Sequence, residues 1–323
     1  MSDKKILQIK KAKLEKKNFQ ASVIQKRRMM EPLRTILFAP GNRPDRAEKA
    51  IGLDADAVVF DLEDAVPIAE KESSRLVVKT LLDGHPGKRM YVRINALSTP
   101  YAKDDLAAIE SKNLNGIMLP KVESTEDVFE IDRRLSKVET RNGLQIGGLE
   151  IISICETAKG LEEIYPILSA KPARHRISVA AFGAADYTLD LGIRLTREGR
   201  ELEYARTRLP IASRAAGIAP PLDTPWMVDL KDIDGLIADA KTAKAYGFQG
   251  KIVIHPNQIR PCNDIFTPSE EEVLQAKRVI DIFESSEKKG MAAILLDGKF
   301  IDYPVVEKSK RILALARSIA ERS

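Results

Sequence analysis

Short apolar runs rich in Ile, Val, Leu and Ala recur along the chain, and each is followed by a segment with the residue spacing of a helix. The runs are apolar at nearly every position, which is typical of parallel strands that are buried on both faces. The pattern predicts eight strands, the seventh of them weak, at residues 35–40, 57–64, 89–95, 116–122, 148–157, 177–186, 217–226 and 251–258.

Helical segments lie between these strands. They begin near residues 45, 70, 125, 158, 201 and 232, and several end in glycine, which favours helix termination. Repeated alternation of strand and helix predicts a (β/α)₈ barrel, the TIM-barrel form of the α/β class.

The pattern changes after residue 265. A segment opening on "TPSEEE" predicts a helix with a Ser/Thr cap, and "AAILLDGKFIDYPV" predicts a hairpin around "DGK", followed by a final helix. We therefore predict a basic extension over 1–31, a catalytic barrel over 32–265 and a C-terminal lid or subunit arm over 266–323.

The charge of the chain is concentrated at its start. Residues 1–30 hold ten Lys or Arg and two acids, so the net charge of +5 leaves about −3 for the rest. The extension lacks the apolar core of a secretory signal, and we interpret it as a solvated segment or a helix that docks on a subunit. Attraction to nucleic acid or membrane is the weaker alternative.

Two further features narrow the class of protein. No apolar run approaches the roughly 18 residues that a membrane helix needs, so we expect no membrane span. The two cysteines, Cys155 and Cys262, form no CxxC motif, which argues against a disulfide scaffold or a zinc ribbon and favours a reducing, cytoplasmic setting.

Ionisable residues gather where the predicted strands end. In a barrel the carboxyl ends of all strands meet on one face, where active sites form. Six of the eight strands place polar or charged residues there, which predicts a functional site built from Asp61, Glu63, Asp64, Arg93, Asn95, Lys121, Glu123, Glu156, Asp186 and His255.

Glu156 and Asp186 are the strongest candidates for a pair of metal ligands, because each ends a long apolar run and the two runs are adjacent strands. Two carboxylates that leave room for water and substrate oxygens suit Mg²⁺. Arg93 can hold a carboxylate or a developing oxyanion, or can instead pair with the acids after the second strand. His255 is a candidate for the same site or a residue that braces its loop.

The first strand–helix turn, "FAPGNRPDRAEKA", carries Arg43, Arg46 and Lys49 after a glycine. A glycine turn that opens a cationic helix can receive phosphates, although the pattern is weak alone. The chain has neither a P-loop nor a GxGxxG motif, which disfavours nucleoside triphosphates and a Rossmann fold.

With these residues identified, the chain resembles the HpcH/HpaI aldolase and citrate lyase β-subunit superfamily, nearest its malyl-CoA and citramalyl-CoA lyase branch. The resemblance covers about 33–310. The strings that carry it are "LFAPGNRPDRAEKA", "VVFDLEDAV", "VRINAL", "LPKVES", "ICETAKG", "FGAADYTLDLG", "GKIVIHPNQI" and "LDGKFIDYPVV".

The resemblance implies roles for individual residues. Glu156 and Asp186 become the Mg²⁺ ligands, with Mn²⁺ as a substitute, and Arg93 contacts the thioester or oxo-acid oxygens. Asp302 becomes an acid that a neighbouring subunit contributes, in a homo-oligomer that is usually a trimer or hexamer. Glu63 and Asp64 join the catalytic candidates. Substrate and CoA binding falls to Phe38, Arg43, Lys49, Arg93, Ala185, Asp186, Ile254 and His255.

The implied reaction is a reversible Claisen-type cleavage of malyl-CoA, β-methylmalyl-CoA or citramalyl-CoA. Its products are acetyl-CoA or propionyl-CoA and glyoxylate or pyruvate. Four alternatives stay open at this point: a citrate lyase β subunit, a class II pyruvate aldolase, a silent CoA-binding regulator, and a nucleic-acid binder that acts through the basic extension.

Overall fold

The computed structural model describes residues 32–288 and 290–322 of the chain, and the predicted basic extension lies outside them. Residues 33–266 form one compact unit, and residues 267–322 form a second together with Pro32. Each unit has its own hydrophobic core. Among the described residues, none of the helices is both long and apolar enough to cross a membrane.

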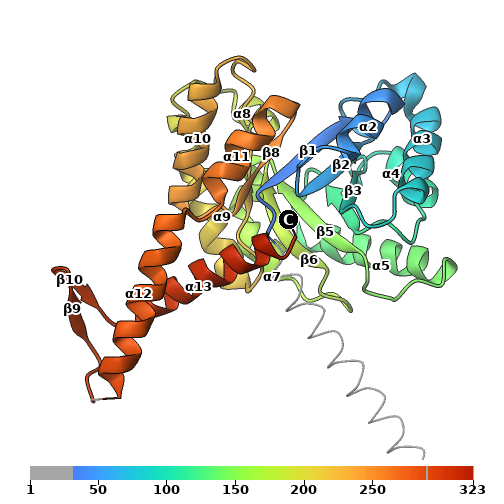
Figure 1. Ribbon diagram of the computed structural model, residues 1–323. Helices are drawn as coiled ribbons and strands as arrows, with labels where there is room; N and C mark the ends of the chain where they lie inside the picture. Colours follow the sequence, from blue (N-terminus) through green and yellow to red (C-terminus); the bar gives the residue numbers. More distant parts are fainter. Residues whose placement is uncertain (1–31, 289, 323) are drawn as a thin grey trace, which may run out of the picture. The chain divides into compact units, whose positions relative to one another are not determined.

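The first unit is a closed barrel of eight parallel strands, which confirms the predicted (β/α)₈ fold (Figure 1). Each strand pairs with the next, and β8 returns to β1 through pairs such as Ile36 with Ile252. The strands are β1 (Thr35–Pro40), β2 (Ala57–Asp61), β3 (Met90–Arg93), β4 (Gly116–Leu119), β5 (Glu150–Cys155), β6 (Ile177–Phe182), β7 (Leu222–Asp223) and β8 (Gly250–Val253).

Helices surround this barrel, and three of them were not predicted from the sequence: α4, α8 and α11. The predicted helix from 158 is two helices, because Pro166 has no N–H to continue the hydrogen-bond ladder from α6. The helices are α2 (Pro44–Ile51), α3 (Lys71–Gly84), α4 (Tyr101–Ala108), α5 (Thr125–Arg141), α6 (Ala158–Glu162), α7 (Ile164–Ser169), α8 (Ala184–Leu191), α9 (Glu203–Ala216), α10 (Ile233–Tyr246) and α11 (Ile259–Phe266).

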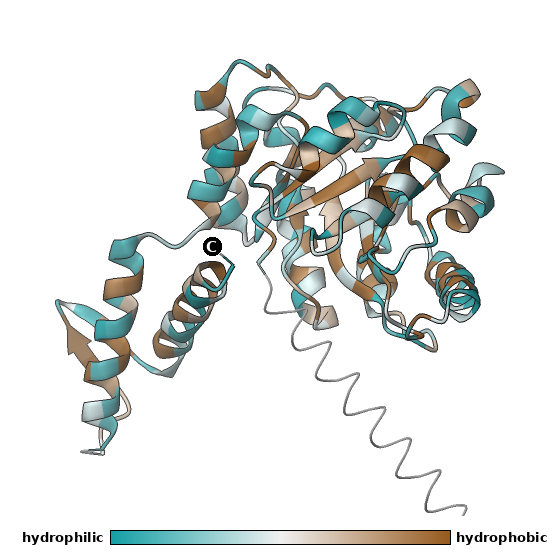
Figure 2. Ribbon diagram, turned by 45° about the vertical axis from the view of Figure 1, so that its right-hand side comes forward, coloured by the Kyte–Doolittle hydropathy of each residue, from teal (hydrophilic) through white to brown (hydrophobic). Residues whose placement is uncertain are grey.

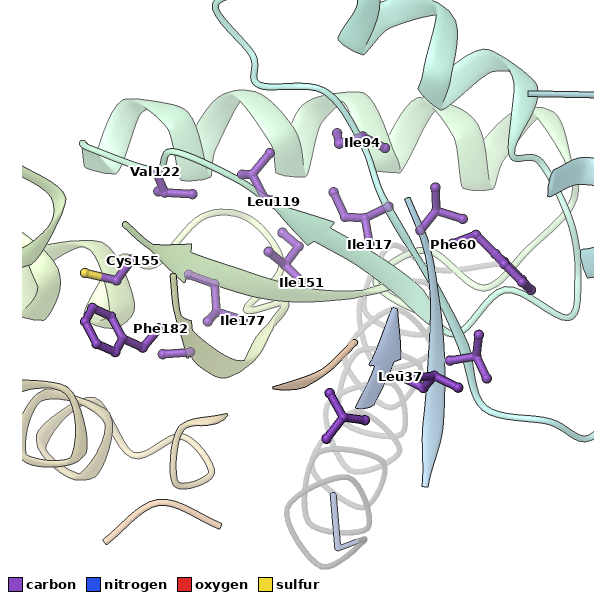
Figure 3. Packing of buried hydrophobic residues seen from close by; sticks show 14 of the residues in the cluster. Leu37, Phe60, Ile94, Ile117, Leu119, Val122, Ile151, Cys155, Ile177 and Phe182 are labelled. Carbon is purple, nitrogen blue, oxygen red and sulfur yellow. The ribbon is translucent and has the colours of Figure 1, made fainter. Parts of the chain in front are cut away.

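Both faces of the strands are buried, as the apolar runs predict. Val58 and Phe60 of β2 belong to the layer between strands and helices, whereas Ala57 and Val59 belong to the layer inside the barrel. The hydropathy colouring shows the apolar strands within a more polar shell of helices (Figure 2). Residues from different strands, such as Phe60 and Ile117, pack in the outer layer (Figure 3).

The second unit contains α12 (Glu270–Glu287), β9 (Ile294–Leu296), β10 (Lys299–Ile301) and α13 (Tyr303–Ala320). Ser269 caps α12 in a capping box with Glu272, as the Ser/Thr signal predicts. The strands β9 and β10 form the predicted antiparallel hairpin, and the two turn residues Asp297 and Gly298 both have positive φ. The role of this unit as a lid or subunit arm stays a prediction.

Candidate functional site

The alternation of side chains along the strands directs three charged groups into the mouth of the barrel. On β2, Ala57 and Val59 face the interior, and Asp61 falls on the same side two residues later. By the same count, Arg93 follows the inward Tyr91 on β3. Glu156 follows the inward Ile154 on β5. The three strands therefore bring these groups together at their carboxyl ends.

Arg93 and Asp61 form a two-pronged ion pair. Nε of Arg93 donates to Oδ1 of Asp61 at 2.7 Å, and Nη2 donates to Oδ2 at 2.6 Å. Asp61 also accepts the backbone N–H groups of Glu63 and Ala65. Burial alone would raise the pKa of Asp61, but the charge and hydrogen bonds of Arg93 outweigh it and lower the pKa. Asp61 therefore stays ionised and fixes the guanidinium.

The acids after β2 are thus the partners of a cation on β3. Nη1 of Arg93 lies 3.1 Å from Glu63 and 3.3 Å from Asp64. Asp64 has an exposed side chain, whereas Glu63 is buried. Glu63 Oε2 accepts no hydrogen bond from the part of the chain that the structure describes, although the cation is near. Burial raises the pKa of Glu63, and the neighbouring cations only partly oppose the rise.

Lys121 links the strand β2 acids to the predicted metal pair. Its Nζ lies 3.0 Å from Oε1 of Glu63 and 3.8 Å from Oδ1 of Asp186. Its backbone N–H donates to Oε1 of Glu156 at 2.8 Å. Burial lowers the pKa of Lys121, but the hydrogen bond to Glu63 and the surrounding carboxylates raise it overall. The sequence predicts Lys121 in the site at a strand end, with an electrostatic or structural part and no specific partner.

Asp186 is close to the predicted position, with one correction. The sequence predicts a strand through residue 186, but β6 ends at Phe182 and Asp186 lies in the first turn of α8. Gly183 lies between the two elements. A side chain does not fit at this position, because a Cβ there would lie 2.5 Å from Oε2 of Glu156. The glycine lets the chain turn into α8 directly beside the Glu156 carboxylate.

We call Asp61, Glu63, Glu156 and Asp186 the carboxylate cluster. Burial, followed by the charges of Glu63 and Asp186, raises the pKa of Glu156 to about 8. Only two cationic side chains, Arg93 and Lys121, form ion pairs with members of the cluster in the described residues. When all four carboxyls are ionised, they exceed the two cations by two negative charges, which a bound divalent cation would neutralise.

The cluster offers an open site rather than a closed cage. Within the described ranges, no three His, Cys, Asp or Glu side chains are grouped so that they could enclose a metal ion. Glu156 and Asp186 together supply carboxylate oxygens only, which suits a hard cation that keeps positions for water and substrate oxygens. The donor set therefore fits Mg²⁺.

The raised pKa of Glu156 predicts a measurable effect on the metal-free protein. The folded state binds this proton up to about pH 8, whereas the ordinary value is 4.5. Stability therefore falls as pH rises through this window. Because glutamine does not titrate, Glu156→Gln should match the wild type near pH 5 and exceed its Tm by about 5 °C at pH 8.5.

Thermal melts in EDTA at both pH values test this effect. Glu163→Gln, at an exposed position between α6 and α7, is the matched control, and its Tm should differ from that of the wild type by the same amount at both pH values. An advantage of Glu156→Gln that fails to grow with pH would show that the Glu156 carboxyl is not held neutral in the metal-free fold.

A cavity of about 400 Å³ adjoins the cluster on the side of β1, α2 and β8. Four of the residues predicted to bind substrate or CoA line it: Phe38, Lys49, Ile254 and His255. The ring of Phe38 also lies 5.1 Å from the guanidinium carbon of Arg93. Phe38 thus connects the cavity to the carboxylate cluster.

The wall of this cavity lacks four predicted binding residues, Arg43, Arg93, Ala185 and Asp186, and also the predicted catalytic Asp302. Arg43 is exposed and pairs with Asp45, while Arg46, one turn before Lys49 on α2, lines the cavity instead. The i, i+3 spacing of Arg46 and Lys49 is the sequence signal that points to Arg46. Ala185 is exposed in the first turn of α8. Asp302 belongs to the second unit, where it caps α13 by accepting the N–H of Val305.

Known proteins resemble this chain in sequence over most of its length. A family model described as HpcH/HpaI aldolase/citrate lyase matches residues 34–256. The citrate lyase subunit beta of Leuconostoc mesenteroides subsp. cremoris is 35% identical over 287 residues, which cover 88% of this chain and 93% of that protein. The mitochondrial citramalyl-CoA lyase of Rattus norvegicus is 31% identical, covering 90% of this chain and 88% of that protein.

A solved structure shares the architecture. The protein CitE from Mycobacterium tuberculosis, crystallised with magnesium, acetoacetate and coenzyme A, superposes with a TM-score of 0.73 at 29% identity. The match covers 89% of this chain and 99% of that one. It therefore includes residues beyond the barrel, since the barrel unit spans only 33–266.

Proposed function

Because the chain belongs to the HpcH/HpaI aldolase/citrate lyase family and is a lyase, we propose that it cleaves a 3-hydroxy-3-carboxyacyl-CoA in a reversible Claisen-type reaction. The substrate is malyl-CoA, β-methylmalyl-CoA or citramalyl-CoA. The bond between carbons 2 and 3 breaks, its electron pair stays on carbon 2, and overall one proton moves from the hydroxyl on carbon 3 to carbon 2. The products are acetyl-CoA or propionyl-CoA and glyoxylate or pyruvate.

One observation carries the proposal. A cavity lined by Arg46 and Lys49 is linked to the carboxylate cluster through its wall, because Phe38 lies 5.1 Å from the guanidinium carbon of Arg93 and Pro40 is the strand partner of Asp61. A CoA thioester presents phosphates at one end and a carboxylate with a hydroxyl at the other. The cations suit the first, and the cluster with a bound divalent ion suits the second.

Glu156 and Asp186 would hold Mg²⁺, for which Mn²⁺ could substitute. The donor set supports this assignment, as does the magnesium in the related CitE crystals. When bound, the ion supplies a Lewis acid for the carboxylate and hydroxyl oxygens of the substrate. Gly183 lets the Glu156 carboxylate lie close to the start of α8, the helix that carries Asp186.

Arg93 stabilises the negative charge that develops on the thioester oxygen when the bond breaks. Asp61 holds its guanidinium through two hydrogen bonds, so the donor is oriented before substrate arrives. Glu63 and Asp64 act on the reaction through Arg93 and Lys121, whose positions they fix. Phe38 lies against the guanidinium and also forms part of the cavity wall.

Asp302 returns the proton to carbon 2 in the lyase direction and removes it in the condensation direction. We propose that it comes from a neighbouring subunit of a homo-oligomer, a trimer or hexamer, so that each active site is shared. The two free, buried cysteines suit the reducing, cytoplasmic setting expected from the sequence.

Mixed oligomers test the shared site. Asp302→Ala and Arg93→Ala proteins should each be nearly inactive, because one lacks the proton carrier and the other the oxyanion donor. Unfolding and refolding them together should restore up to about a quarter of the wild-type activity, since a site with neither defect then forms at some interfaces. Size exclusion confirms reassembly, and a mixture that reassembles without recovering activity would refute sharing.

A citrate lyase β subunit is the second candidate, because the relative with 35% identity has that description. A panel of malyl-, β-methylmalyl-, citramalyl- and citryl-CoA offered to the isolated protein separates the two. Release of glyoxylate or pyruvate supports the CoA lyase, whereas release of oxaloacetate alone supports the citrate lyase subunit. Tight CoA binding without any turnover would indicate a regulatory protein.

A further inference from the structure

Lys121 contacts three members of the carboxylate cluster through two different parts of the residue. The backbone N–H binds Glu156, and the ammonium group lies against Glu63 and towards Asp186. The side chain is one-third exposed, so it extends into the open mouth of the barrel instead of being packed in the core. The residue therefore spans both proposed metal ligands.

The backbone of Lys121 adopts a conformation that its side chain disfavours. Its φ is 51°, in the left-handed region. This region is strained for a residue with a Cβ and suits glycine or asparagine. Glycine at this position would keep the hydrogen bond from the N–H to Glu156 without strain. What lysine provides in addition is an ammonium group among the carboxylates.

We propose that Lys121 is a built-in counter-cation of the carboxylate cluster. Resting on the proposed function, this inference makes Lys121 a positioning residue that competes with the divalent ion. In the metal-free protein the ammonium neutralises part of the charge between Glu63 and Asp186 and holds the cluster together. When a divalent ion binds, the ammonium opposes it electrostatically, so Lys121 weakens metal affinity and keeps the ion exchangeable.

Titration of the full-length metal-free protein with Mn²⁺, followed by electron paramagnetic resonance at pH 8.5, tests this role. Lys121→Met removes the charge and keeps the length of the side chain. Lys121→Gly removes the charge and also relieves the backbone strain, so it guards against a failure to fold. Lys159→Met is the matched control, because Lys159 is an exposed lysine on α6 whose ion pair within the described part of the chain is with Glu123, outside the cluster.

We expect both Lys121 variants to bind Mn²⁺ about tenfold more tightly than the wild type, since a nearby positive charge is gone. Lys159→Met should bind as the wild type does. In EDTA, the Tm of Lys121→Met should be lower than that of the wild type, and saturating Mg²⁺ should close the gap.

Unchanged or weaker Mn²⁺ affinity in both folded Lys121 variants would overturn the inference, because the ammonium would then not oppose the ion. A wild-type protein that binds no Mn²⁺ would instead refute the proposed metal site itself. Glu156→Gln shows whether the measured Mn²⁺ binding occurs at the proposed site, because this substitution should abolish it.

Discussion

Replacing Asp186 by asparagine is expected to lower lyase activity at least about a thousandfold, because a metal ligand contributes several kcal/mol to the stabilisation of developing charge. The asparagine would keep the size of the side chain and its place in the first turn of α8, so the fold should survive. The loss should therefore appear in kcat, and raising Mg²⁺ should recover only part of it. Glu156→Gln should behave alike.

The matched control for this loss is Asp234→Asn. Asp234 is an exposed acid in the first turn of α10, the same kind of position on another helix of the barrel. Its substitution should leave kcat and the Mg²⁺ dependence unchanged. Steady-state rates over a Mg²⁺ series measure both quantities. If the Asp186→Asn protein kept a tenth of the wild-type activity, Asp186 would not be a ligand of the metal ion.

Replacing Arg93 by lysine should lower kcat about a hundredfold or more, although the positive charge remains. An ammonium group cannot reproduce the two parallel hydrogen bonds to Asp61, so the donor is no longer fixed. The variant should also melt at a lower temperature, because Asp61 is only 1% exposed and loses a well-placed partner.

Arg34→Lys separates the catalytic part of that loss from the structural part. Arg34 pairs with Asp56 through the same two-pronged geometry and is similarly buried, but it lies next to the amino end of β1, away from the cluster. The Arg34→Lys substitution should lower Tm and leave kcat near the wild-type value. Equal losses of kcat in the two variants would mean that Arg93 acts only through stability.

Much of the barrel could be predicted from the sequence because its strands are buried on both faces. Continuous apolar runs such as residues 57–60 leave few alternatives to a parallel strand, and strand–helix alternation then fixes the topology. Strand β7 gave a weak signal for a physical reason: it contains only Leu222 and Asp223. Helix α11 was missed because the eighth strand was predicted to run to residue 258, directly before the helix begins, whereas β8 ends at Val253.

The site was harder to predict than the fold, because contacts across strands leave no trace in local sequence. The sequence left two roles open for Arg93, and only the structure shows that it pairs with Asp61, 32 residues earlier at the end of β2. The role of Lys121 depends on a positive φ that lysine does not signal. Asp186 lies on α8 because the chain turns at Gly183. The requirement for glycine at that turn is visible only in the structure, where Glu156 lies beside it.

The most direct test of the central claim is an assay of the purified full-length protein with malyl-CoA, β-methylmalyl-CoA and citramalyl-CoA, in Mg²⁺, in EDTA, and after Mg²⁺ is restored. The account predicts that at least one thioester releases glyoxylate or pyruvate, that EDTA stops the release, and that Mg²⁺ restores it. A folded protein that cleaves none of the three, or that cleaves one equally well in EDTA, would contradict the account.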